Sequence, residues 1–200
     1  MTELKKNRVK TVMKYTWPFY ILAGLLVFVV MSIIFGVVHP IPAYKSLTLF
    51  VTGEVQGRDK LRNDVFAKFE EKQIRSFSCI AARRADGDYA TKLKVAGYTS
   101  ADVLILPNSV IEEVSDPSSF ALTLGDELIN SFYKDYSFYQ RNEINYGIKI
   151  DKDKVMDYMT LPNEDCYLFL NGSSKNIGDY GLKPVKEHDM ALQIVKDWGM

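Results

Sequence analysis

Residue types that carry enzyme chemistry are sparse in this sequence, and they stand in no recognisable catalytic pattern. The 200-residue chain has two histidines, His39 and His188, and two cysteines, Cys79 and Cys166. Neither histidine has a base or ligand cluster beside it, and no Gly-x-Ser-x-Gly elbow presents a serine. Both cysteines fall in expected strands, where we interpret them as small buried apolar residues. We therefore predict that the chain is not an enzyme and has no zinc site.

One acidic stretch has the spacing of half a calcium-binding loop. Asp151, Asp153 and Asp157 occupy the first, third and seventh positions of such a loop. The sixth position needs Gly and the twelfth Glu, but this chain has Met156 and Pro162 there. The start of a solvated helix is the better interpretation, and we expect neither a metal nor another cofactor.

Two further motifs carry weak signals. The stretch Gly53-Glu-Val-Gln-Gly57 matches neither a phosphate loop nor the three-glycine dinucleotide pattern. Arg83-Arg84 is a basic pair at the end of an expected strand, where a solvated edge is the plainer interpretation and an anion clamp the alternative. No basic stripe favours nucleic acid as a partner.

Aromatic residues gather between residues 132 and 146, which is the one unusual shift in composition. Tyr and Phe at this density can line a sugar- or peptide-binding face, or fill a partner's groove. The alternative is that they cover the edge of the sheet. The residues concerned are Phe132, Tyr133, Tyr136, Phe138, Tyr139 and Tyr146.

The N-terminal segment has the pattern of a membrane anchor. Residues 1–17 carry five basic residues and one Glu, a net charge of +4, which the rest of the neutral chain balances with −4. Residues 18–38 contain no charge and would span about 31 Å as a helix. A cleaved signal peptide or a buried core helix fits this length and composition less well. We predict a single-pass protein of the cell membrane. It has a cytoplasmic basic tail (1–17), an uncleaved transmembrane helix (18–38), a proline spacer (39–45) and an extracytoplasmic domain (46–200).

The elements of that domain alternate between strand and helix. Apolar patterns predict strands over 46–52, 74–80, 102–106, 143–150 and 165–171. Amphipathic patterns predict helices over 58–72, 88–96, 109–114, 124–133, 152–159 and 186–198. Because the first three strands alternate with helices at short spacing, we predict an α/β domain with a mostly parallel sheet of about five strands.

The order of these features resembles the type 2 periplasmic (extracellular) solute-binding proteins, which are the substrate receptors of ABC importers. YATKL (89–93) is similar to the helix motif of that family, and DVLILP (102–107) to the strand that follows it. YGI (146–148) is similar to its strand leading to the hinge. The resemblance implies a binding module, accessory to uptake, whose partner is an ABC permease and whose ligand is a solute such as a sugar.

The chain departs from that family in length. Family members have two lobes, whereas here only about 15 residues separate GIKI (147–150) from CYLFLN (166–171). We therefore expect a single lobe, which cannot trap a ligand by hinge closure. The alternative function is a structural or interaction protein that uses the former ligand edge to bind a membrane partner or a second copy of the chain.

A ligand site, if the lobe has one, is expected at the carboxyl ends of the strands, where open parallel sheets meet their ligands. Glu54 and Asn108 are the expected hydrogen-bonding groups at this edge. The predicted ligand-binding residues are Thr52, Gly53, Glu54, Arg83, Asn108 and Ser109.

Overall fold

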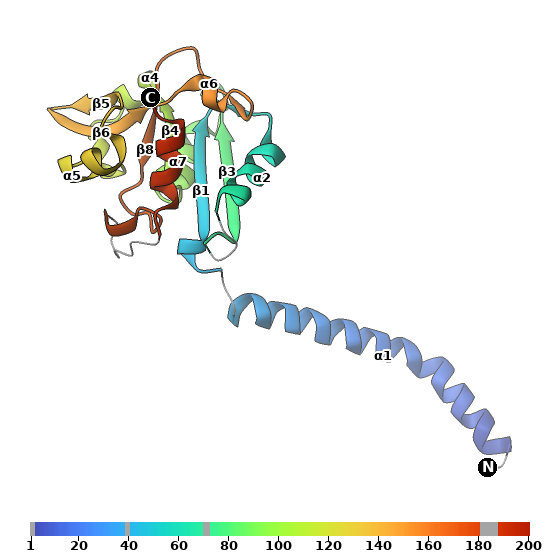
Figure 1. Cartoon of the computed structure of the whole chain (residues 1–200). Helices are drawn as coiled ribbons and strands as arrows, with labels where there is room; N and C mark the ends of the chain where they lie inside the picture. Colours follow the sequence, from blue (N-terminus) through green and yellow to red (C-terminus); the bar gives the residue numbers. More distant parts are fainter. Residues whose placement is uncertain (1–2, 39–40, 70–72, 181–187) are drawn as a thin grey trace. The chain divides into compact units, whose positions relative to one another are not determined.

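The structure is a computed structural model that describes residues 3–38, 41–69, 73–180 and 188–200. The chain divides into two compact units, Met1–Pro40 and Ile41–Met200 (Figure 1). The last residues of the predicted helices over 58–72 and the first of that over 186–198 lie outside the described residues.

The first unit is a single helix, α1, which runs from Glu3 to Val38. Within it, the segment Thr16–Phe35 is long and apolar enough to cross a membrane, and none of it is buried against protein. Twenty residues of α-helix rise about 30 Å, which is the thickness of the hydrocarbon layer of a bilayer.

The second unit is built on a six-stranded sheet with the order β3-β1-β4-β8-β6-β5. A separate two-stranded sheet pairs β2 with β7. The strands are β1 (Ser46–Thr52), β2 (Glu54–Val55), β3 (Ser76–Ala82), β4 (Val103–Pro107), β5 (Phe138–Arg141), β6 (Ile144–Lys149), β7 (Met159–Thr160) and β8 (Cys166–Leu170).

The prediction of a mostly parallel sheet is wrong. Only β1 forms parallel pairs, with β3 and with β4, while β4–β8, β8–β6 and β6–β5 are antiparallel. Parallel neighbours need a long crossover, which the helices between β1, β3 and β4 supply. Strands β5 and β6 are joined by a turn too short for a crossover, so this pair can only be antiparallel.

A tight hairpin joins β5 to β6 and was missed in the sequence. Its turn consists of Asn142 and Glu143, which both have positive φ, 52° and 64°. Two such residues in succession form the turn type that matches the twist of a two-stranded hairpin. Asn adopts this conformation readily but Glu does not, so the sequence signal for the turn is weak.

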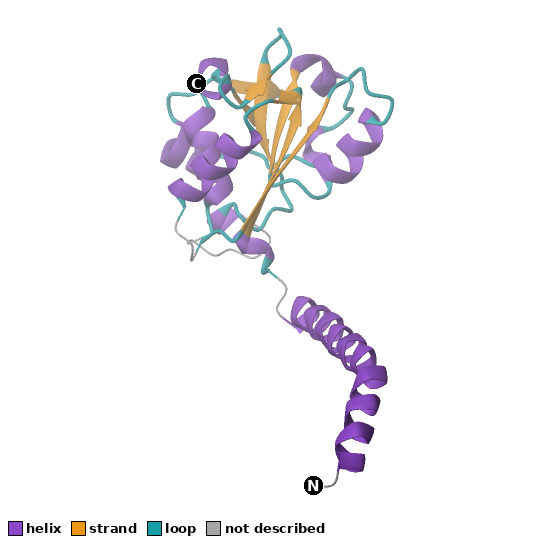
Figure 2. Ribbon diagram, turned by 90° about the vertical axis from the view of Figure 1, so that its right-hand side faces the viewer, coloured by secondary structure: helices purple, strands orange, loops and turns teal. Residues whose placement is uncertain are grey.

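Helices cover both faces of the sheet (Figure 2). One face carries α2, α5, α6 and α7, and the opposite face carries α3, its π-helical continuation and α4. The α-helices are α2 (Arg58–Lys68), α3 (Tyr89–Lys92), α4 (Asn108–Glu112), α5 (Asp126–Leu128), α6 (Lys152–Val155) and α7 (Met190–Trp198). The π-helical stretches are Leu93–Tyr98 and Ile129–Tyr133, and the 3-10 turns are Ala43–Lys45, Pro117–Ser119 and Gly178–Tyr180.

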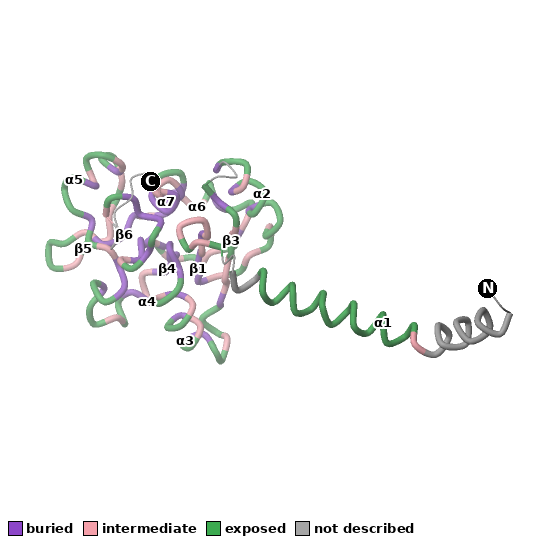
Figure 3. The backbone as a smooth tube through the Cα atoms, turned by 90° about the horizontal axis from the view of Figure 1, so that it is seen from below, coloured by how far each residue is buried: buried purple, intermediate pink, exposed green. Residues whose placement is uncertain are grey.

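Strand alternation divides the interior into two cores. In β1, Leu49 and Val51 enter the core under α2 and α7, while Phe50 enters the core under α3. All five residues of β4 are buried, as expected for a central strand with helices on both sides. Buried backbone accordingly gathers at the centre of the unit (Figure 3).

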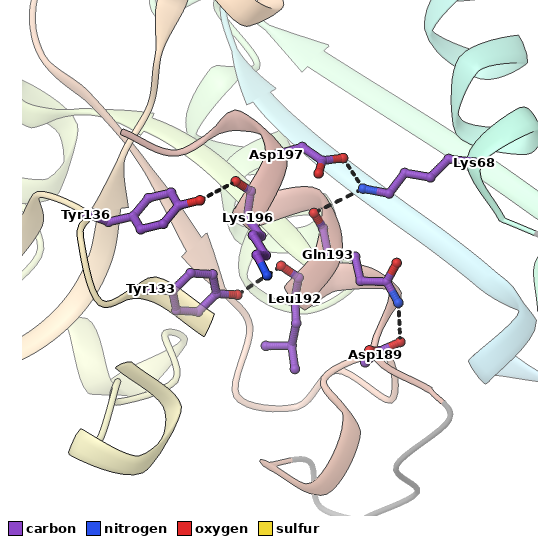
Figure 4. A network of polar contacts seen from close by, with 8 residues as sticks. All are labelled: Lys68, Tyr133, Tyr136, Asp189, Leu192, Gln193, Lys196 and Asp197. Atoms are coloured by element: carbon purple, nitrogen blue, oxygen red, sulfur yellow. Dashed lines mark hydrogen bonds and ion pairs between the residues drawn. The ribbon is translucent and has the colours of Figure 1, made fainter. Parts of the chain in front are cut away.

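Tyrosines of the aromatic segment bind α7 from one side (Figure 4). The hydroxyl of Tyr133 donates to the carbonyl of Leu192 at 3.0 Å, and that of Tyr136 to the carbonyl of Lys196 at 2.7 Å. On the other side of α7, Lys68 of α2 binds the same helix (Figure 4). The tyrosines therefore act here as packing residues with a polar tip.

Tyr139 of the same segment packs on β8. The ring of Tyr139 lies 5.4 Å from that of Tyr167 and 5.8 Å from that of Phe169. A Cβ on Gly147 would come within 2.8 Å of the Phe169 ring, so this ring needs the glycine beneath it. These contacts agree with the interpretation that the aromatic segment covers the sheet.

Both cysteines are free and lie in strands, Cys79 in β3 and Cys166 in β8. Burial raises the pKa of the Cys79 thiol to about 12 and that of the Cys166 thiol to about 11. Because the thiolate is the reactive species, both behave as small apolar residues at neutral pH.

Candidate functional site

The order of the strands creates a divergence point between β1 and β4. From β1 the chain passes through α2 to β3 on one side, and then through α3 to β4 on the other side. Since α2, which follows β1, and α4, which follows β4, lie on opposite faces, the connections that leave the carboxyl ends of β1 and β4 separate from each other. In open α/β sheets this is the position where ligands bind.

A cavity of about 310 Å³ lies at this point. Four of the six predicted ligand-binding residues line it, namely Thr52, Gly53 and Glu54 after β1 and Arg83 after β3. Pro107, the last residue of β4, also lines the cavity. The volume falls at the lower end of the range for small-molecule sites, about 300–1,000 Å³.

Asn108 and Ser109 do not line the cavity, although the prediction included them. The amide of Asn108 donates to Oε1 of Glu112 at 2.7 Å within its own helix. The backbone N–H and hydroxyl of Ser109 donate to the two carboxylate oxygens of Glu164, at 2.8 and 2.7 Å. Both side chains are thus engaged in contacts that hold the wall together.

The opposite wall comes from the connection between β6 and β8, which is short in the sequence and was not expected to contribute to a site. Thr160, Leu161, Pro162 and Glu164, in the chain between β6 and β8, line the cavity. Here β7 pairs with β2, in the register Glu54 with Thr160. The connection between β6 and β8 therefore closes over the edge of the sheet where a second lobe was expected to be missing.

Two glycines permit this closure. A Cβ on Gly53 would lie 2.5 Å from the carbonyl oxygen of Thr160, and one on Gly57 would lie 2.5 Å from that of Asp157. Any larger residue at these positions would push the two segments apart. In the sequence, Gly53 and Gly57 match no phosphate-binding pattern. Their spacing is nevertheless the one signal that could have indicated a close approach between two backbone segments.

Arg84, which the prediction omitted, also lines the cavity. Its guanidinium donates to the hydroxyl of Ser109 at 2.9 Å and pairs with Glu113. Ser109 in turn binds Glu164, so a polar chain runs from β3 through α4 to the opposite wall. Arg84 also lines a second cavity of about 420 Å³, which residues of α3 and α4 line as well.

The charges of the cavity are not paired with each other. Arg83 pairs with Asp86 at 3.3 Å, and the N–H and guanidinium of Arg83 keep the pKa of the Asp86 carboxyl below its usual range. Neither Arg83 nor Arg84 forms an ion pair with Glu54. Among the described residues, the carboxylate of Glu54 has no hydrogen bond or ion pair.

Thr52 forms the buried floor beside these charges. It is 1 % exposed, and its hydroxyl shares a hydrogen bond of 2.9 Å with the hydroxyl of Tyr89. Burial raises the pKa of Tyr89, which therefore stays a neutral phenol. This bond joins the end of β1 to α3 and fixes one side of the cavity.

A second polar cluster lies at the opposite, amino end of β4. The carboxylate of Asp102 is 7 % exposed and accepts from the N–H of Thr48 at 2.7 Å, the hydroxyl of Ser174 at 2.5 Å and the amide of Asn176 at 3.0 Å. Burial raises the pKa of this carboxyl, and the three hydrogen bonds oppose the rise. The cluster ties β1 to the connection between β8 and α7, which is a structural role.

Among the described residues no group of three or more His, Cys, Asp and Glu is placed to hold a metal ion. Comparison with protein-family models, with curated proteins and with solved structures finds no match to this chain.

Proposed function

We propose that the chain is a membrane-anchored, extracytoplasmic binding module that takes a small solute in the cavity between the carboxyl ends of β1 and β4. The observation that carries the proposal is the position of this cavity at the divergence point of the sheet, with charged side chains in its lining that form no ion pair with each other. In this proposal α1 is the anchor, with the basic residues 1–17 in the cytoplasm.

The proposal retains the resemblance to one lobe of a type 2 solute-binding protein and a role as an accessory to uptake beside an ABC permease. A single lobe has no partner lobe to close on its ligand. The β7 segment supplies an opposing wall from the same chain, which supports a site that holds ligand without hinge motion. A preformed wall of this kind reduces the ordering cost of binding.

Binding is tested by thermal unfolding of the full-length protein in detergent micelles against a panel of sugars, amino acids and short peptides. A ligand at 100 times its Kd stabilises the native state by about 2.7 kcal/mol. For a domain of this size that shift in free energy corresponds to about 5–10 °C in Tm.

The control is a variant that fills the cavity. Thr160 is exposed and lines the cavity, so Thr160→Trp should abolish the ligand-induced shift. Thr123→Trp, at an exposed threonine outside the cavity, should leave the shift unchanged. The proposal is wrong if no compound raises Tm, or if Thr160→Trp retains the full shift.

A role as an interaction protein is the second candidate, and β3 favours it. This outermost strand has the sequence SFSCIAA, which contains no charge and no proline. Natural sheets usually protect such an edge with charges or proline, because it can pair with another strand. If two copies pair through β3, sedimentation of the full-length protein should show a dimer that Ser78→Lys converts to a monomer and Thr123→Lys does not.

A further inference from the structure

Three of the four charged groups of the cavity lie on two neighbouring strand ends, and the fourth, Glu164, lies on the opposite wall. Arg83 and Arg84 follow β3, and Glu54 follows β1. These strand ends are held side by side, since the N–H of Gly53 donates to the carbonyl of Ala82 at 3.1 Å. Even so, Glu54 pairs with neither arginine, and both arginines pair with residues outside the cavity instead. Two carboxylates, Glu54 and Glu164, and two guanidinium groups therefore line the cavity without forming ion pairs with each other.

The arginines retain hydrogen-bonding capacity for an anion. A guanidinium has five N–H donors, and Arg83 uses only its Nε in the contact with Asp86. The ion pairs that both arginines form are exposed, and pairs of that kind contribute about 0–1 kcal/mol, so they do not compete strongly with a ligand. Guanidinium groups bind planar carboxylates in a two-point geometry, which favours a carboxylate as the anionic part of the ligand.

The two carboxylates of the cavity differ in availability. Both oxygens of Glu164 already accept hydrogen bonds from Ser109. Glu54 is exposed, and its carboxylate has no partner among the described residues. Glu54 is therefore the group that can accept from a ligand ammonium, and its charge disfavours a ligand with several negative charges such as a nucleotide.

The rest of the wall is apolar. Pro107, Leu161 and Pro162 line the cavity between the charged groups and the β7 segment. Together with the volume of about 310 Å³, these residues suit a short aliphatic body rather than a sugar ring, whose hydroxyls need a polar partner each.

From this arrangement we infer that the ligand is a small aliphatic α-amino acid, bound as a zwitterion. Its carboxylate contacts Arg83 and Arg84, its ammonium contacts Glu54, and its side chain packs on Pro107, Leu161 and Pro162. The inference rests on the proposed function, because it names the class of solute for the same cavity.

Isothermal titration of the full-length protein in detergent micelles tests the inference with four probes. L-Leucine carries both charges, leucinamide lacks the carboxylate, N-acetylleucine lacks the ammonium, and glucose is neutral. Leucine should bind, and both leucine analogues should bind at least tenfold more weakly, because each leaves one charged group of the cavity without its partner.

Variants assign each charge to its residue. Glu54→Gln should weaken leucine at least tenfold and leave the weak binding of N-acetylleucine unchanged. Arg83→Gln should weaken both of these ligands and leave leucinamide unchanged. The matched controls, Glu127→Gln and Arg62→Gln, change exposed residues outside the cavity and should have no effect.

The outcomes separate the inference from the proposed function. If glucose or a singly charged analogue binds as tightly as leucine, and Thr160→Trp blocks that binding, the inference is overturned while the binding module stands. If leucine binds but Glu54→Gln has no effect, the assignment of the ammonium is overturned. If none of the probes and no compound of the wider panel binds, both the inference and the proposed function fail.

Discussion

Asp102 provides the sharpest test of how this fold is held together. Asp102→Ala removes a carboxylate that accepts hydrogen bonds from Thr48, Ser174 and Asn176, at 2.7, 2.5 and 3.0 Å. Hydrogen bonds to a charged group contribute about 1.5–3 kcal/mol each, so the gross loss is roughly 5–9 kcal/mol. The substitution also removes the cost of burying a charge, which is several kcal/mol and offsets part of that loss.

The expected net effect is a loss of about 3 kcal/mol, because the N–H of Thr48 and one N–H of the Asn176 amide lose their acceptor, while the Asn176 amide keeps its bond to the carbonyl of Ser46. In a chain of this size, this loss lowers Tm by about 6–12 °C. It is a large share of the stability of a typical domain, about 5–15 kcal/mol.

Urea unfolding of the full-length protein in detergent micelles, followed by tryptophan fluorescence, measures the change. Trp198 is almost fully buried in the second unit and reports its unfolding. Asp135→Ala is the matched control, because Asp135 is exposed. A loss below about 1 kcal/mol at an unchanged m-value would refute the reasoning, since a buried three-bond acceptor cannot be that dispensable.

Three further predictions follow from the same contacts. Because burial raises the pKa of Asp102 above its unfolded value of 3.8, protonation of this carboxyl adds to the native stability. That added part is complete below pH 3.8 and is lost as pH rises through the folded pKa, so the difference in unfolding free energy between wild type and Asp102→Asn should fall over that window. Gly53→Ala should separate β2 from β7 and abolish the ligand-induced Tm shift, because its Cβ would lie 2.5 Å from the carbonyl oxygen of Thr160; an undiminished shift in calorimetry would contradict this. Tyr133→Phe should cost about 1 kcal/mol in urea unfolding, since it removes one buried hydrogen bond to Leu192, and no change would mean that water replaces the bond.

Apolar patterns in the sequence located most elements of the second unit. Strands β1 and β4 were evident in the sequence because a central strand is buried on both faces. Such a strand therefore consists mostly of consecutive apolar residues. Hairpin β5–β6 was missed because its turn uses Glu143 at positive φ, which local propensity disfavours. Strand direction beyond β4 was also mispredicted, because an apolar run carries no information about which neighbour it pairs with.

The candidate site was predictable in part for the same reason. Thr52, Gly53, Glu54 and Arg83 were found because strand ends at one edge of a sheet are brought together by any parallel βαβ unit. Ser109 was assigned to the ligand, but Glu164 occupies its hydrogen-bonding groups from a segment 55 residues away.

By itself, therefore, the sequence determined an N-terminal helix with a long uncharged apolar segment, an α/β alternation and the strand ends from which a site could be built, because each depends on neighbouring residues. Only the tertiary structure decided the mixed sheet, the closure of β7 over the strand ends and the separation of Glu54 from both arginines. Those features depend on contacts between distant segments, whose geometry is set by packing of the whole domain and leaves no local pattern.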